Sequence, residues 1–116
     1  GSLMFGRFRN AGVSLSDTNL TAVYTVPTNF TAIVKEIFLT NVDGTSAVDA
    51  TLKYTDTSAS ATFSLISTKS IAADSYLRLE NANIILEEGD ILKAQAGAGN
   101  DLTVSVFVEE LYRPQG

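Results

Sequence analysis

Apolar and polar residues alternate along two segments of the chain, 48–55 and 102–111. The apolar positions are Val48, Ala50, Leu52 and Tyr54 in the first segment, and Leu102, Val104, Val106 and Val108 in the second. Successive side chains of a β-strand point to opposite faces of its sheet, so this period of two predicts strands with one buried face and one solvated face.

A third segment, 32–44, is apolar on both faces of an extended chain. β-branched and aromatic residues dominate it, which favours a strand over a helix. A near-continuous apolar run predicts a central strand that is buried on both sides, with the 102–111 strand as its neighbour. Asn41, Asp43 and Gly44 end this strand with residues that favour tight turns.

Shorter alternating segments predict the rest of the fold. Their expected inward residues are Leu20, Ala22, Tyr24 and Val26 in 20–26, Phe63 and Leu65 in 62–68, and Leu77 and Leu79 in 75–79. Further strands are expected at 84–86 and 91–96, and a short pairing segment at 15–17. About eight strands joined by turns, without a helical period, predict an all-β protein with a single antiparallel β-sandwich, jelly-roll or Greek-key like. The strand order stays open.

The two ends of the chain lie outside this pattern. Gly1-Ser2 has the form of a remnant left by tag removal, and residues 1–10 are expected to be a flexible arm before a β-sandwich domain at 11–112 and a tail at 113–116. Residues 3–10 carry two aromatic residues and two arginines without an acid. They are therefore either a loose terminus or an arm that docks on an acidic neighbour. The candidate contact residues are Phe5, Arg7, Phe8 and Arg9, with Tyr112 and Arg113 as second choices.

Composition excludes several classes of partner. The 116 residues carry a net charge of −5, which disfavours nucleic acid because phosphate neutralisation needs clustered Lys and Arg. No apolar run approaches the ~20 residues that span a bilayer, so no membrane partner is expected. Cysteine is absent from the sequence, which excludes disulfides and thiolate metal sites.

Little catalytic chemistry is available to this chain. Histidine is absent as well as cysteine, so only a carboxylate pair remains for catalysis. Glu87, Glu88 and Asp90 occupy one expected turn, while Glu109 and Glu110 are adjacent in a strand and point to opposite faces. We therefore expect no enzyme activity and no cofactor.

Metal and carbohydrate sites have weak signals. Asp43, Asp49, Asp56 and Asp101 form no dense Asp-x-Asp-x-Asp array, so they are interpreted as solvated turn acids and no metal is expected. Tryptophan is absent, and of the four tyrosines only Tyr76 is expected to point outward. A packing role is the default for the others.

Several segments resemble small structural proteins of tailed bacteriophages. The first runs from Tyr24 to Asn41 and contains Val26-Pro27, Thr31-Ala32 and a strand that ends in Asn. A Glu88-Gly89-Asp90-Ile91 turn, a Gly/Asn loop at 97–100 and a Val-rich closing strand follow. The resemblance covers about residues 20–110. It implies a virion component without catalytic residues, often symmetric and commonly trimeric.

Together these observations predict a non-catalytic virion protein of a tailed bacteriophage, most concretely a capsid decoration (cement) protein that stabilises the head. Its expected partners are two further copies of itself in a homotrimer, and the major capsid protein or another virion protein. It would be made in the host cytoplasm and reside on the surface of the particle. The alternative is a tail or fibre accessory module that binds a receptor or glycan.

Overall fold

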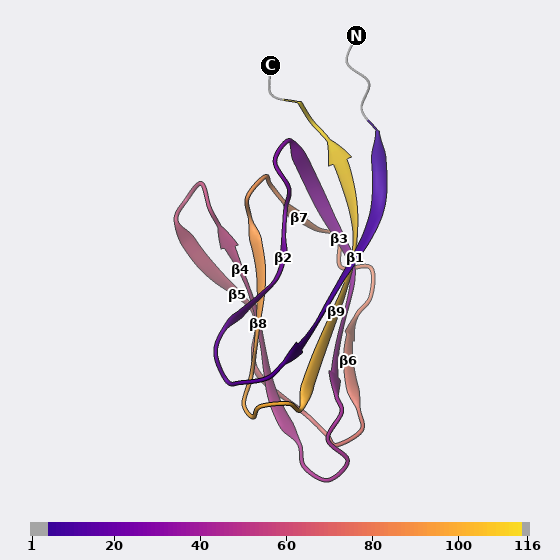
Figure 1. Ribbon diagram of the computed structural model, residues 1–116, viewed down its shortest axis with the longest axis vertical. Helices are drawn as coiled ribbons and strands as arrows, with labels where there is room; N and C mark the ends of the chain where they lie inside the picture. The colour runs from indigo at the N-terminus through magenta and orange to yellow at the C-terminus, as the bar shows by residue number, and fades with distance from the viewer. Residues whose placement is uncertain (1–4, 115–116) are drawn as a thin grey trace.

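The computed structural model describes residues 5–114, which form nine strands in two antiparallel sheets (Figure 1). The strands are β1 (Gly6–Leu15), β2 (Thr21–Thr25), β3 (Phe30–Asn41), β4 (Val48–Asp56), β5 (Ala61–Ile71), β6 (Tyr76–Leu79), β7 (Ile84–Leu86), β8 (Ile91–Ala96) and β9 (Leu102–Tyr112). The five-stranded sheet has the order β1-β9-β3-β6, with β7 also paired to β3, and the four-stranded sheet has the order β2-β8-β4-β5. No helix long and apolar enough to cross a membrane occurs in the described residues.

The strands pair in order from the two ends of the chain toward its middle, as in one long hairpin wrapped around the core. The first strand pairs with the last, β2 pairs with β8, β3 pairs with β6 and β7, and β4 pairs with β5. Pairing from the chain ends inward, with successive pairs alternating between two packed sheets, is the jelly-roll topology. The predicted fold class is therefore confirmed, and the order of the strands, which the sequence left open, is that of a jelly roll.

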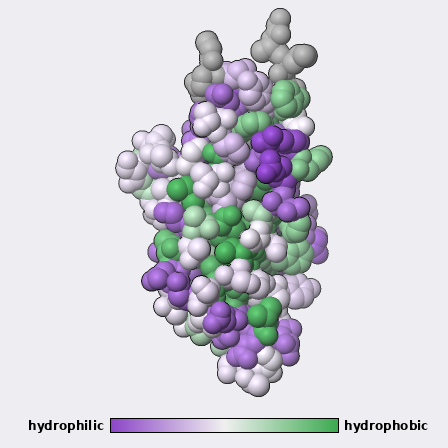
Figure 2. All heavy atoms as spheres, viewed as in Figure 1, coloured by the Kyte–Doolittle hydropathy of each residue, from purple (hydrophilic) through white to green (hydrophobic). Residues whose placement is uncertain are grey.

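The core lies between the inner faces of the two sheets. Val48, Ala50 and Leu52 of β4 are buried, and Leu102, Val104, Val106 and Val108 of β9 face them from the other sheet. In Figure 2, apolar residues gather in the middle of the view, between the sheets that Figure 1 shows edge-on. The alternation predicted for β4 and β9 is confirmed, as is the pairing of β9 with β3.

The central strand β3 differs from its prediction. Only one face is buried, and a β-bulge between Val34 and Glu36 shifts the register against β9. Before the bulge Ala32 and Val34 are buried, and after it Ile37 and Leu39 are. The extra residue reverses which sequence positions face inward. Because the inward positions shift by one at the bulge, the apolar residues of β3 occupy both even and odd positions. The segment therefore has the sequence pattern of a strand buried on both faces, although only one face is buried.

Bulges also explain the errors in the outer strands. Leu65, predicted inward, is 37% exposed because bulges in the β4–β5 pairing place Ile66 opposite the buried Leu52 instead. Phe63, also predicted inward, lies opposite Tyr54 and contacts its ring, but is 47% exposed. The far end of the β4–β5 hairpin also extends away from the other sheet, which leaves it uncovered (Figure 1). In β2 a bulge after Ala22 likewise leaves Ala22 exposed.

The N-terminal arm is the third correction. Gly6 to Asn10, expected to be flexible, are the first half of β1 and pair in continuous register with Leu111 to Phe107 of β9. These residues lack the alternating apolar pattern because the four-stranded sheet does not cover them, and each is exposed. Their order comes from a backbone ladder, which composition does not reveal. Residues 1–4 and 115–116, including the expected tag remnant, lie outside the described part of the chain.

Candidate interaction site

Both termini of the described chain lie at one end of the sandwich, which we call the terminal end (Figure 1). It comprises the start of β1, the end of β9, the β2–β3 turn at 27–29 and the β7–β8 turn at 87–90. Four of the six predicted contact residues lie on or beside these segments, and the other two follow further along β1. The four are Phe5, Arg7, Tyr112 and Arg113, and the two are Phe8 and Arg9.

An aromatic stack joins the two termini. The Phe5 and Tyr112 rings stack with centroids 5.2 Å apart, and Tyr112 meets the Phe30 ring edge-on at 5.5 Å. The Arg7 guanidinium lies 4.2 Å from the centroid of the Phe30 ring. These contacts form a row within the chain, from Phe5 through Tyr112 and Phe30 to Arg7.

A buried carboxylate connects the sheets below this stack. Glu110 is 1% exposed and accepts hydrogen bonds from Arg7 Nε, at 2.7 Å, and from the Tyr24 hydroxyl. Arg7 and Glu110 belong to the five-stranded sheet and Tyr24 to the other. Burial, together with the hydrogen bond to the Glu110 carboxylate, raises the pKa of Tyr24. The carboxylate therefore links the two sheets at the terminal end.

The two segments that carry the phage-protein resemblance meet at this end. Asn29, at a φ of 69°, closes the β2–β3 turn, where its N–H donates to Glu88 Oε2 at 3.1 Å and its carbonyl accepts from the Arg113 N–H at 2.6 Å. Gly89, at a φ of 83°, donates its N–H to the Val26 carbonyl at 3.0 Å. Asn and Gly suit these positions because both tolerate positive φ.

Asp90 has a structural role in the β7–β8 turn. It is 5% exposed, and its carboxylate accepts the N–H groups of Thr57 at 3.1 Å and Glu87 at 2.9 Å. The Thr57 hydroxyl donates to the Gly89 carbonyl at 2.7 Å. The sequence offered the acids of this turn as candidates for a catalytic carboxylate pair. In the structure the Asp90 carboxylate instead binds backbone N–H groups and stabilises the turn.

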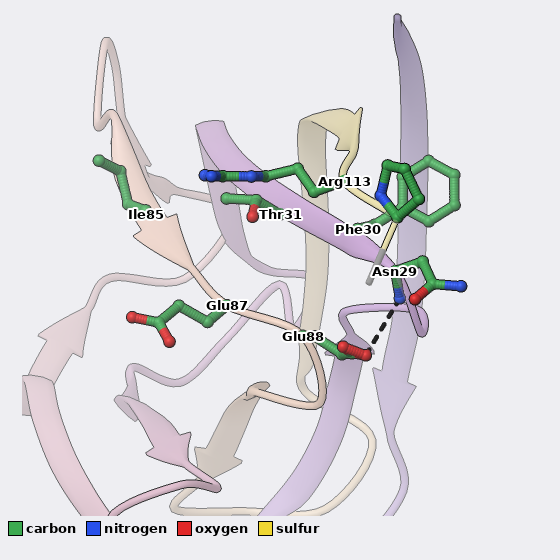
Figure 3. A pocket seen from close by; sticks show the side chains of 8 residues that line it. Asn29, Phe30, Thr31, Ile85, Glu87, Glu88 and Arg113 are labelled. Carbon is green, nitrogen blue, oxygen red and sulfur yellow. Dashed lines mark hydrogen bonds between the residues drawn. The ribbon is translucent and has the colours of Figure 1, made fainter. Parts of the chain in front are cut away.

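A pocket of about 460 Å³ opens beside these turns (Figure 3). Its lining combines Phe30, Thr31 and Ile85 with the charged residues Glu87, Glu88 and Arg113. Figure 3 shows the Arg113 side chain extending across Thr31 toward Ile85, with Glu87 and Glu88 on the other side of the opening. Charges of both signs around a partly apolar floor suit a polar peptide segment or another ligand with paired charges.

The predicted contact residues divide between two places. Phe5, Arg7, Tyr112 and Arg113 belong to the terminal end, whereas Phe8 and Arg9 line a groove of about 370 Å³ on the other side of β1. The Arg7 side chain is directed to Glu110 within the chain. The sequence offered no signal for Phe30 or Ile85 as site residues, because both have the pattern of ordinary strand positions.

The two adjacent acids of β9 are separated by the sheet. Glu109 and Glu110 lie on opposite faces of β9, as predicted: Glu110 is buried and Glu109 faces Lys35 at 3.7 Å on the outer face. No group of three potential metal-ligating side chains occurs within residues 5–114. The terminal end itself combines an aromatic stack, a partly apolar pocket and charges of both signs.

The fold places this chain in the class of jelly-roll β-sandwich proteins. No protein-family model and no curated protein matches the sequence. Solved structures match its fold, including the acid-stable capsid of the Helicobacter pylori bacteriophage KHP30, with a TM-score of 0.55 and 9% identity over 97% of this chain and 94% of that one.

Two further structures match at similar levels. A Bacillus endospore appendage, from a family of disulfide-linked pili, has a TM-score of 0.54 and 12% identity over 97% of this chain and 89% of that one. The virus-like particle of the extra small virus of the prawn Macrobrachium rosenbergii has a TM-score of 0.52 and 11% identity over 97% and 81%. At these identities the likeness establishes the fold alone.

Proposed function

We propose that this chain is a non-catalytic structural subunit of a virus particle. The observation that supports the proposal is the jelly-roll topology, which matches chains of a phage capsid and of a virus-like particle over 97% of the sequence. The third similar structure is a pilus subunit. What these proteins have in common is repeated assembly, which fits a small chain with exposed apolar side chains on several elements.

The narrower proposal is a capsid decoration protein of a tailed bacteriophage, a homotrimer that binds the major capsid protein at the particle surface. It is supported by the resemblance of 24–41 and 88–91 to small phage structural proteins, since these segments pack together around Asn29 and Glu88. The terminal end would then face the shell, with Phe5, Tyr112 and Arg113 in contact and Arg7 holding the stack beneath them.

The test is to locate the protein in particles. An antibody against the purified chain is used to probe density-gradient fractions from a culture that produces the virus, and immunogold labelling then places the protein on the head or the tail. Co-migration with the major capsid protein and label on the head are expected. Confinement of the protein to cell fractions would overturn the proposal.

A matched pair of variants tests the terminal end. Arg113→Glu should abolish binding of added protein to particles that lack it, because it reverses the charge at the rim of the pocket. Lys69→Glu makes the same change at an exposed position of β5 and should leave particle binding unchanged. Removing residues 1–10 is a poor test, since it deletes half of β1 and leaves Glu110 without Arg7.

The alternative, a receptor- or glycan-binding module, is supported by the pocket in Figure 3, whose lining includes the carboxylates of Glu87 and Glu88 and the guanidinium of Arg113. Such groups can bind hydroxyl-rich ligands by hydrogen bonds. A glycan array that gives a specific signal, lost in Arg113→Glu, together with immunogold label on the tail, would favour this function over the decoration protein.

A further inference from the structure

A second surface, on the outer face of the five-stranded sheet, shares Ile85 with the pocket of the terminal end and otherwise lies apart from it. We call it the outer-face patch, and its apolar members are Phe8, Ile33, Phe38, Tyr76, Ile85 and Phe107. Phe8, Ile85 and Tyr76, at 80%, 68% and 60%, are the most exposed large apolar residues of the described chain. In Figure 2 apolar residues alternate with hydrophilic ones along the right margin, where Figure 1 places β1, β9, β3 and β6.

Strand register assembles this patch from five strands. Phe8 is opposite Glu109, Glu109 is opposite Ile33, and Ile33 is opposite Ile85, which makes one row from β1 to β7. Further along the sheet, the Phe38 ring lies 6.1 Å from that of Tyr76 and 6.2 Å from that of Phe107. The patch is continuous across the sheet because cross-strand neighbours share a face.

The charged residues of this face are paired with one another. Lys35 lies 3.7 Å from Glu109, and Arg78 lies 2.7 Å from Glu36 and 3.8 Å from Glu80, so two bases are paired with three acids. The Arg78 guanidinium also lies 5.3 Å from the centroid of the Phe38 ring. These pairs leave one negative charge of the chain's net −5, so two copies would repel each other less through this surface than the net charge of the whole chain predicts.

The patch has both a protruding side chain and a groove that could receive the same side chain of a second copy. Phe8 projects from β1, and beside it lies the groove of about 370 Å³ lined by Phe8, Asn10, Lys35 and Phe107 among others. A symmetric contact between identical chains requires a protruding group and its receiving hollow on the same surface. An aromatic ring seated in an apolar hollow is a common anchor of protein interfaces.

From these observations we propose that the outer-face patch is the surface through which a second copy of this chain binds. The patch spans about 20 Å along β9 and about 19 Å across four strands, from the usual spacings of a sheet. That is about 400 Å² in projection, roughly half of what one partner contributes to a standard interface. The contact is therefore weak on its own and is reinforced where other contacts hold the copies together. It deepens the proposed function by naming the contact between subunits.

The test uses the isolated chain, so it does not depend on particle binding. Sedimentation velocity is measured from about 10 μM to about 1 mM, the range in which a contact of this size dissociates. The wild type is expected to associate as concentration rises. A Phe8→Ser, Tyr76→Ser double variant should need at least a tenfold higher concentration, with an unchanged melting temperature.

A matched control lies on the other sheet. Phe63→Ser, Leu65→Ser also removes two exposed apolar side chains, at 47% and 37% exposure, and should associate like the wild type. A wild type that stays monomeric across the range overturns the proposal, even if the protein is found in virions. Equal weakening by both double variants also overturns it, as does a patch variant that associates normally but no longer binds particles.

Discussion

Glu110 accepts hydrogen bonds from two other strands, although its own sequence context suggests nothing unusual. It follows Glu109 in an alternating strand, and only the fold shows that one acid is solvated while the other is buried against Arg7 and Tyr24. A buried carboxylate is tolerated because both of its oxygens have charged or polar donors. Its role is to join the two sheets where the aliphatic core ends.

Replacing Glu110 tests this role. Glu110→Ala leaves the Arg7 charge and the Tyr24 hydroxyl without their acceptor, and should lower the free energy of unfolding by about 3 kcal/mol. This value is at the low end of the range for breaking a buried ion pair, because Arg7 is partly exposed. Glu109→Ala, which breaks only a surface pair, should cost less than about 1 kcal/mol. Urea denaturation of both variants gives the comparison, and equal losses would contradict the assignment.

The raised pKa of Tyr24 gives a pH signature. The folded state favours the neutral phenol, so the unfolded chain loses the Tyr24 proton first, near the ordinary value of 10. The stabilising effect of Tyr24 is complete below that pH and declines as pH rises above it. The stability gap between wild type and Tyr24→Phe, measured by urea denaturation from about pH 8 to about pH 11, should therefore narrow above about pH 10. A constant gap would argue against the shift.

At the scale of elements, bulges decide which residues are inside. β3 buries Ala32 and Val34 before its bulge and Ile37 and Leu39 after it, so a single additional residue reverses the inward positions. β9 opposite is regular and needs no such change. A bulge separates the part of β3 that pairs with β7 from the part that pairs with β6.

This arrangement predicts an asymmetry between two deletions. Deleting Lys35 removes the unpaired residue and leaves a regular alternation in the same register with β9, so the protein should still fold, with a loss of at most about 3 kcal/mol. Deleting Phe38 places Leu39 and Asn41 on the wrong face and should abolish folding. Circular dichroism and thermal melting distinguish the two, and a folded Phe38 deletion would refute the explanation.

Asn41 shows how a strand end becomes part of the core. It is 1% exposed, and its amide donates to the carbonyls of Ser46 at 2.9 Å and Ile71 at 3.0 Å while its oxygen accepts the Asp43 N–H at 2.9 Å. The sequence predicted a turn here from Asn and Asp. It did not predict that the amide would also hold the distant end of β5.

At the scale of the whole molecule, the first and last strands of the described chain meet. β1 pairs with β9 over ten residue pairs and forms one ladder between segments about 90 residues apart. A jelly roll thus depends on contacts between residues far apart in the chain, whose closure costs conformational entropy before the contacts form.

This topology predicts slow folding. In stopped-flow refolding the described domain should fold in milliseconds to seconds, as other chains dominated by distant strand pairs do. The Gly12→Ala variant, which alters β1 near its middle without a close contact for the new methyl group, should change the rate little. Folding in microseconds would show that local hairpins, rather than the pairing of the ends, limit the rate.

The sequence by itself determined the class of fold, most of the strands and the turns between them. Alternation at β4 and β9 needs only a period of two, and Asn, Asp and Gly mark turns through their tolerance of positive φ. The lack of histidine and cysteine narrowed the available chemistry through composition alone, because a missing residue type is missing in every fold.

Tertiary structure alone decided the rest. Strand order, the bulges in β2, β3 and β4–β5, and the ordering of Gly6 to Asn10 all arise from pairing between distant segments, which a local pattern does not encode. The same pairing gathers Phe5, Phe30 and Tyr112 at one end and spreads Phe8, Phe38 and Ile85 over one sheet face. The register between paired strands determines which side chains share a face of the sheet. That register depends on segments that are far apart in the sequence.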